Sequence, residues 1–291
     1  MLKLLTMSKY FFLFLFSISF YVSNAQTKND SIPVKHWKIS GTNSLTGAQT
    51  SFDKWQIGGT NNLTVNAKIN YDFNYHKKDW SWDNKVLATY GFNRNKRNST
   101  KKTDDRIELN SILSKTMNKQ WSYSAYMNFQ TQFDKGYDPT DETKNISRFM
   151  SPVFLQLGPG VLWKKNDNFK INISPASTKF IFVHEKFTKN GKSFSVEQHE
   201  TQRLEFGAAA YVYYRVKVLE NITIENILGL YSNYIENTKN VDFDYQLNID
   251  MKVTKFITAN INYQALYDNE TFGALQQRQN IGVGFKYSFH N

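Results

Sequence analysis

Apolar and polar residues alternate along most of this chain. The stretch NNLTVNAKINYDFNYH, residues 61–76, has an apolar residue at every odd position from Leu63 to Tyr75 and a polar or charged residue at the positions between. A period of two is typical of a β-strand with one apolar and one polar face. The pattern alone allows two arrangements: the apolar face inside, as in a soluble sandwich or lipocalin, or outside, as in a membrane barrel.

The same alternation recurs in further segments that are separated by turn signals. We predict twelve strands, at 37–51, 61–75, 82–96, 105–117, 120–134, 147–164, 168–182, 203–218, 221–236, 240–253, 256–267 and 276–289. Pro152, Pro159 and Pro175 interrupt the sixth and seventh. Proline cannot donate to a strand ladder, so we expect an edge, a bulge or a break at these positions.

The connections between these strands differ in length. Those after strands two, four, six, eight and ten have six residues or fewer, whereas those after strands one, three, five, seven and eleven are long; NTK, after strand nine, is short. Short turns on one side and long loops on the other are typical of outer-membrane barrels. The predicted fold class is therefore all-β, an up-and-down antiparallel transmembrane β-barrel of about 12 strands.

Charge separates the two faces of the strands. The six clearest strands present 40 alternate positions with no charged residue, as expected of a lipid-facing surface where a midplane charge costs roughly 2–4 kcal/mol. Several runs also alternate over thirteen or more residues, well beyond the five or six of an average soluble strand. The opposite faces hold five basic and six acidic residues, a near balance that argues against strong ion selectivity. We predict that the following line the lumen: Lys68, Asp72, Glu205, Arg215, Asp244, Asp250 and Lys286.

The first 25 residues read as a cleaved export signal. Lys3 and Lys9 precede an apolar run of about 13 residues, shorter than the roughly 20 of a membrane-spanning helix, and Ser23–Ala25 offers small residues for cleavage. We then expect a short periplasmic segment, 26–36, and one barrel domain, 37–291. Aromatic residues near the short turns, among them Trp80 and Trp121, predict an interfacial girdle.

Several motifs resemble a family of outer-membrane barrel proteins of Bacteroidota that is known only as domain of unknown function 3078. They are FDKWQIGGTNNLTVNAKINY (52–71), KTDDRIELNSIL (102–113), FQTQFDKGY (129–137), SPVFLQLGPGVLWK (151–164), NISPASTKF (172–180) and LYDN (266–269). Their sharpest residues are Trp55, Gly58, Gly59, Asp104, Asp105, Thr131 and Gln132. The resemblance implies a barrel in the outer membrane and no particular activity.

Little in the sequence indicates catalysis. The chain has no cysteine, and its five histidines are scattered; His184-Glu185 lacks the second histidine of a metalloprotease motif. No Ser–His pair stands out on neighbouring predicted strands. We therefore predict no catalytic, metal or cofactor site. Acidic residues 138–142 form a solvated loop in preference to a calcium site.

The expected membrane location and the basic residues of one loop indicate which partners the protein has. A basic loop carries Arg94, Lys96, Arg97, Lys101 and Lys102, which would face lipopolysaccharide phosphates if the loop is extracellular. We expect outer-membrane lipids and the barrel-assembly machinery as partners, and no nucleic acid. The expected role is a narrow pore for small hydrophilic solutes. The alternatives are a non-conducting barrel whose loops bind lipopolysaccharide or a partner protein, and a membrane-embedded hydrolase.

Overall fold

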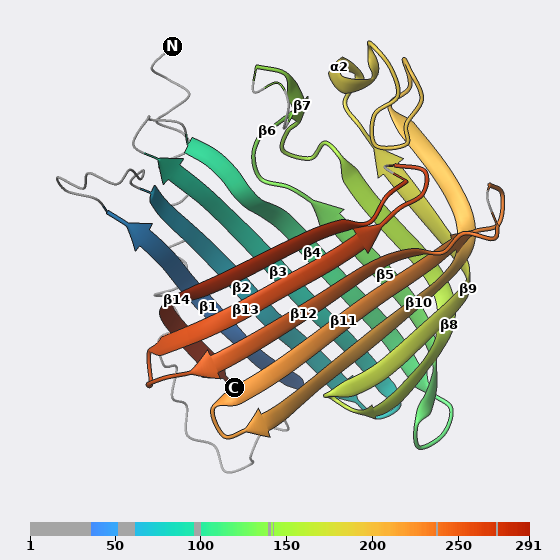
Figure 1. Cartoon of the computed structure of the whole chain (residues 1–291). Coiled ribbons are helices and arrows are strands. Elements are labelled where there is room, and N and C mark those ends of the chain that lie inside the picture. The colour runs from blue at the N-terminus through green and yellow to red at the C-terminus, as the bar shows by residue number, and fades with distance from the viewer. Residues whose placement is uncertain are drawn as a thin grey trace, which may run out of the picture. The chain divides into compact units, whose positions relative to one another are not determined.

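Twelve long strands close into one antiparallel barrel in the computed structural model (Figure 1). The structure describes residues 36–51, 62–95, 100–138, 141, 143–236, 238–271 and 273–291, so the predicted export signal, 1–25, and residues 26–35 lie outside the described residues. The barrel strands are β1 (Trp37–Thr50), β2 (Asn62–Lys77), β3 (Trp80–Asn95), β4 (Thr100–Thr116), β5 (Trp121–Thr131), β8 (Val153–Asn166), β9 (Phe169–Phe182), β10 (Gln202–Leu219), β11 (Ile222–Asn233), β12 (Asp242–Lys252), β13 (Ile257–Tyr267) and β14 (Gln276–His290).

The barrel closes where the first strand meets the last. β1 pairs with β2 on one side and with β14 on the other, from Ser40 opposite His290 to Gly47 opposite Val283. All other neighbours in the ring are consecutive barrel strands, and every pair is antiparallel. The predicted up-and-down barrel of about 12 strands is confirmed.

The sixth strand begins later than predicted. β5 ends at Thr131 and β8 starts only at Val153, while a two-stranded hairpin, β6 (Gly136–Tyr137) and β7 (Asn145–Ser147), lies between them. Pro152 has no N–H to give to a ladder, and the Gln132 side chain donates to the backbone carbonyls of Asp134 and Arg148. These bonds hold the segment before Val153 as a folded loop.

The other two prolines lie within strands, at irregularities of the ladder. Pro159 falls in β8 where its register with β9 shifts between Leu157 and Val161, and Pro175 falls in β9 where the register with β10 shifts. The bulge expected from these prolines is therefore present in both strands.

Two connections differ from their predicted lengths. The loop after β11 spans 234–241 and is long, because the Asn233 side chain accepts from the amides of Ile235 and Glu236 and ends the strand. The loop after β3 is short, 96–99, because β4 starts at Thr100, opposite Arg94. The loop after β11, the β6–β7 hairpin and the short helix α2 (Glu185–Thr188) share one end of the barrel (Figure 1). Within the described ranges no helix is long and apolar enough to cross a membrane.

Apolar side chains cover the outside of the barrel. Ile281, Val283 and Phe285 in β14 and Leu204 in β10 are between 56% and 69% exposed, while the residues that alternate with them face inward and are glycine or polar. Near the short turns aromatic rings meet on the outer surface, such as Trp37 against Tyr75 at 5.1 Å between ring centroids. An apolar band with an aromatic collar is the surface of a barrel that sits in lipid.

Candidate functional site: a barrel interior closed by ion pairs

Side chains from opposite walls of the barrel touch each other. The ring order is β1-β14-β13-β12-β11-β10-β9-β8-β5-β4-β3-β2, so strands six places apart face each other across the lumen. Lys85 on β3 reaches Glu225 on β11 at 2.9 Å, and Arg106 on β4 reaches Asp244 on β12 at 2.7 Å. The interior is therefore bridged across its full width at two levels.

The first set of bridges, which we call the short-turn layer, consists of Asp72, Lys85, Arg215 and Glu225. Glu225 accepts from Lys85, from Arg215 at 2.5 Å and from the Tyr213 hydroxyl at 2.9 Å. Arg215 on β10 also reaches Asp72 on β2, the opposite strand, at 3.2 Å. The Lys85 and Glu225 side chains are each only 6% exposed, so the layer is desolvated as well as charged.

The second set, the long-loop layer, consists of Arg106, Glu108, Asp244 and Gln246. Arg106 forms ion pairs of 2.7 Å with both Glu108 and Asp244. The Gln246 amide on β12 donates to Glu108 on β4, 3.2 Å away across the barrel. Because buried charges are stable only when paired and hydrogen-bonded, this set holds its members in place.

Apolar rings and aliphatic side chains fill the space beside the two layers. One buried cluster inside the barrel comprises Ile112, Tyr126, Leu162, Tyr211, Tyr213 and Ile227. Further toward the short turns, Asp83 on β3 receives both Lys164 at 2.8 Å and Lys170 at 3.0 Å. A twelve-stranded barrel lies between side-chain-filled eight-stranded barrels and open porins, and in this barrel buried side chains from several strands occupy part of the interior.

The predicted lumen residues lie among these contacts. Asp72, Arg215 and Asp244 belong to the two layers. Lys68 on β2 donates to Asn248 on β12 and Asn262 on β13, at 2.6 and 2.7 Å. Asp250 and Lys286 pair at 3.1 Å and line a cavity of about 340 Å³ at the short-turn end. Glu205 accepts from Arg203 at 2.9 Å near the long loops.

The sequence analysis missed four charged members of the two layers: Lys85, Glu225, Arg106 and Glu108. Their strands were not among those with the clearest alternation. A usable signal was present in β4, where Arg106, Glu108 and Asn110 alternate with Ile107 and Leu109. That the charges meet across the lumen depends on which strands face each other, and no local pattern contains that information.

A cavity of about 260 Å³ opens above the long-loop layer, and we call it the vestibule. Its walls combine polar side chains of the layer with aromatic rings, among them Tyr126, Tyr211, Tyr231 and Phe154. The connection 183–201 covers part of it, because Phe194 lines the cavity while Val196 packs against Ile181 in a buried cluster.

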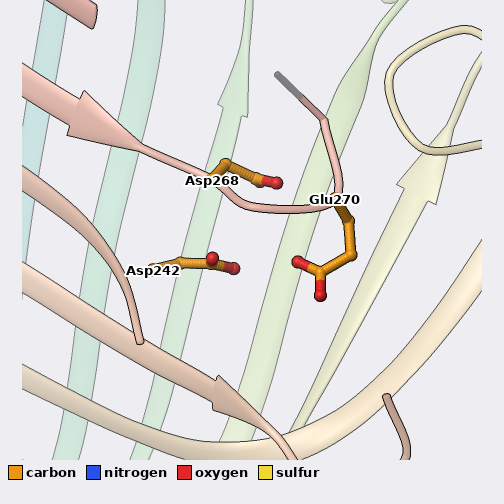
Figure 2. Close-up of side chains that lie close together, drawn as sticks. All are labelled: Asp242, Asp268 and Glu270. Atoms are coloured by element: carbon orange, nitrogen blue, oxygen red, sulfur yellow. The ribbon is translucent and has the colours of Figure 1, made fainter. Parts of the chain in front are cut away.

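Three carboxylates gather at the rim of the vestibule. One oxygen each from Asp242, Asp268 and Glu270 lies within 4.8 Å of the others (Figure 2). The Lys179 ammonium is 3.3 Å from Asp268 and 3.8 Å from Asp242. Burial raises the pKa of Asp268, but Lys179 and hydrogen bonds from Thr271 outweigh burial, so this pKa lies below its ordinary value and the side chain is ionised.

Two motifs of the family resemblance, KTDDRIELNSIL (102–113) and FQTQFDKGY (129–137), lie together in the structure. The Asp105 carboxylate accepts from the amides of Phe133 at 2.6 Å and Asp134 at 3.0 Å, and pairs with Lys102 at 2.6 Å.

Neighbouring motif residues are also engaged. The Thr131 hydroxyl donates to the Pro152 carbonyl at 2.8 Å, and Asp104 accepts from Thr89 and Arg278. These residues tie β4 and β5 to the loop that follows. Trp55, Gly58 and Gly59 lie outside the described residues.

The basic loop is only partly described. Lys96 and Arg97 lie outside the described residues, Arg94 and Lys101 are exposed, and the Lys102 ammonium is held by Asp105.

A Ser–His pair does exist, contrary to our sequence analysis: His76 Nδ1 and Ser81 Oγ, on facing positions of β2 and β3, are 2.9 Å apart. Within the part of the chain that the structure describes, no carboxylate is hydrogen-bonded to this histidine.

Comparisons with known proteins give matches to outer-membrane barrels at low sequence identity. The fold is similar to an outer membrane channel from Pseudomonas putida F1, with 10% identity, a TM-score of 0.39, and coverage of 92% of this chain and 100% of that one. It is also similar to the translocator domain of the autotransporter NalP from Neisseria meningitidis, with 10% identity, a TM-score of 0.35 and coverage of 89% and 90%.

The outer membrane channel DcaP of Acinetobacter baumannii matches with 11% identity, a TM-score of 0.32 and coverage of 87% and 95%. No curated protein sequence matches this chain. Residues 47–137, which include β2, β3, β4, β5 and all the sharpest motif residues from Trp55 to Gln132, match the model of the family described as protein of unknown function (DUF3078).

Proposed function

We propose that this protein is an outer-membrane barrel that is closed to free diffusion of solutes. The observation that carries the proposal is the contact between diametrically opposite strands, Lys85 with Glu225 and Arg106 with Asp244. The apolar outer surface and the alternation of short turns with longer loops support the membrane location. Of the roles considered from the sequence, the non-conducting barrel is favoured over the narrow pore.

The closed state is stable because the charged side chains of each layer are paired with opposite charges. Two basic and two acidic side chains make up the short-turn layer, and the Tyr213 hydroxyl supplies a further hydrogen bond to it. Opening a path would expose these pairs one by one and leave buried charges without partners, which is strongly unfavourable. A general porin has the opposite design, with charges spread along a wet wall.

Conductance across a planar lipid bilayer tests the proposal. The refolded protein, shown to be inserted by its different migration when unheated and when boiled, should give no stable current steps. Reproducible steps from the unmodified protein, or swelling of proteoliposomes in a small sugar, would overturn it.

A set of variants locates the closure. Alanine at Asp72, Lys85, Arg215 and Glu225 removes the short-turn layer as a unit, and alanine at Arg106, Glu108 and Asp244 removes the long-loop layer. We expect current steps only when both layers are removed. Current steps after removal of a single layer would show that the remaining layer does not close the barrel. If the combined variant does not fold, the measurement on the unmodified protein still decides.

A further inference from the structure

The vestibule carries more negative than positive charge. Near its rim the described residues include four carboxylates, Glu205, Glu236, Asp242 and Asp268, and two basic groups, Lys179 and Arg203. These side chains alone leave two negative charges, in a chain whose formal net charge is +11. A locally negative mouth raises the concentration of cations and repels anions.

The internal lysine does not neutralise this site. Lys179 is within 3.8 Å of Glu205, Asp242 and Asp268, so its single charge is shared among three carboxylates. Glu270, the remaining member of the group in Figure 2, comes from the loop after β13 and lies beside the other two carboxylates. Room for a further positive group therefore exists on electrostatic grounds.

The walls suit an organic cation. The Lys179 ammonium already lies over the Tyr231 ring, 5.2 Å from its centroid, which shows how that face receives a positive charge. Tyr126, Tyr211 and Phe154 add further aromatic surface to the same cavity. Aromatic faces combined with carboxylates are the usual surroundings of ammonium ligands.

One polar atom in the vestibule lacks a partner. The Tyr231 hydroxyl is buried and makes no hydrogen bond to the described residues, although Tyr231 itself is only 6% exposed. Buried hydroxyl groups are nearly always satisfied by protein, water or a ligand. The position of Tyr231, opposite Asp242 in the β11–β12 ladder and on the cavity wall, places this hydroxyl where a bound molecule could satisfy it.

We propose that the vestibule binds a small organic cation, with its ammonium group at Asp242, Asp268 and Glu270 and its body against the aromatic walls. The volume of about 260 Å³ admits a molecule of a few carbon atoms with its charged group. The connection 183–201 covers the ligand, because Ser195 and Thr271 join this connection to the loop after β13 by a hydrogen bond of 2.8 Å. The site does not depend on whether the barrel conducts.

The experiment compares choline with its neutral isostere, 3,3-dimethylbutan-1-ol, by isothermal titration calorimetry on the full chain in detergent. Choline should bind at least about tenfold more tightly than the neutral alcohol, and more weakly as salt is added. Equal affinity for the two molecules, or no binding of choline, would overturn the proposal. Binding of Ca²⁺ alone, with no choline binding, would show a metal site and would also overturn it.

Two variants assign the binding to this cavity. At Gly229, which lines the vestibule, an added Cβ would have only the Asp244 carbonyl oxygen nearby, at 4.0 Å. Gly229→Leu should therefore fill the cavity without a backbone clash and abolish choline binding. Asp268→Asn should weaken it by about tenfold, whereas Asp141→Asn, in an exposed loop, should leave it unchanged. Retention of binding in a folded Gly229→Leu protein would place the ligand elsewhere and contradict the proposal.

Discussion

Lys85 on β3 and Glu225 on β11 stand on opposite walls of the barrel, and their side chains meet at 2.9 Å. Both side chains are almost fully buried, and Arg215 joins them on the same carboxylate. A closed β-sheet normally separates its opposite walls by a lumen; here that separation is bridged by charge. This contact explains why a barrel with a polar interior need not be an open pore.

Removing one partner of this pair should destabilise the protein strongly. Glu225→Ala leaves Lys85 and Arg215 buried without their shared carboxylate, and we expect a loss of about 3–5 kcal/mol in the free energy of unfolding. Urea titration of the protein in lipid vesicles measures it. The matched control is Glu197→Gln, which breaks the exposed pair with Lys192 and should change the free energy by less than about 1 kcal/mol. Similar effects of the two variants would show that the interior pair is hydrated.

The cost of placing a charge on the outer surface should depend on how deep the residue lies in the bilayer. Val283 lies near the middle of β14 and faces outward, so Val283→Arg should cost about 2–4 kcal/mol in a lipid bilayer. Gln279→Arg, two outward positions closer to the long loops, should cost about 0–1 kcal/mol, because the side chain reaches the interface. Equal costs at the two positions would argue against a bilayer around this strand.

The hydrogen bonds of Asp105 predict that its removal lowers the free energy of unfolding and also speeds hydrogen exchange at the amides that it holds. Asp105→Ala removes the acceptor for the amides of Phe133 and Asp134, and we expect a loss of about 2–4 kcal/mol because bonds to a charged group contribute about 1.5–3 kcal/mol each. Hydrogen exchange at these two amides should accelerate. Asp141→Ala serves as the control, since Asp141 bonds only locally to Thr143. Unchanged exchange at Phe133 would contradict this role.

The turn between β8 and β9 carries an acid with a low pKa. Burial raises the pKa of Asp167, but the hydrogen bond from Lys38 and the charge of Lys164 outweigh burial and lower this pKa to about 2. Because the folded pKa lies below the unfolded value of about 3.9, the stabilising contribution is complete above that value and is lost as the pH falls through about 2. Carbon NMR titration of the side chain should show this. Lys38→Met should raise the measured pKa; an unchanged value would mean that the cross-barrel pair does not form.

Much of the barrel could be predicted because its strands carry their own signal. The alternation in residues 61–76 requires a strand with one apolar face, and twelve such runs require a large β domain. Strand ends were harder to predict where side-chain hydrogen bonds compete with the strand ladder. The Gln132 amide holds the chain before Val153 as a loop, and the Asn233 side chain ends β11 early, although neither effect changes the alternation of the neighbouring residues.

The sequence by itself determined the number and the faces of the strands, because a period of two is a local property of the backbone and lipid excludes charge from one face. Only the tertiary structure decided what the polar face does. Lys85 and Glu225 are 140 positions apart in the chain, and they meet because ring closure places β3 opposite β11. The same closure joins separate inward charges into two paired layers and leaves an excess of carboxylates at the vestibule.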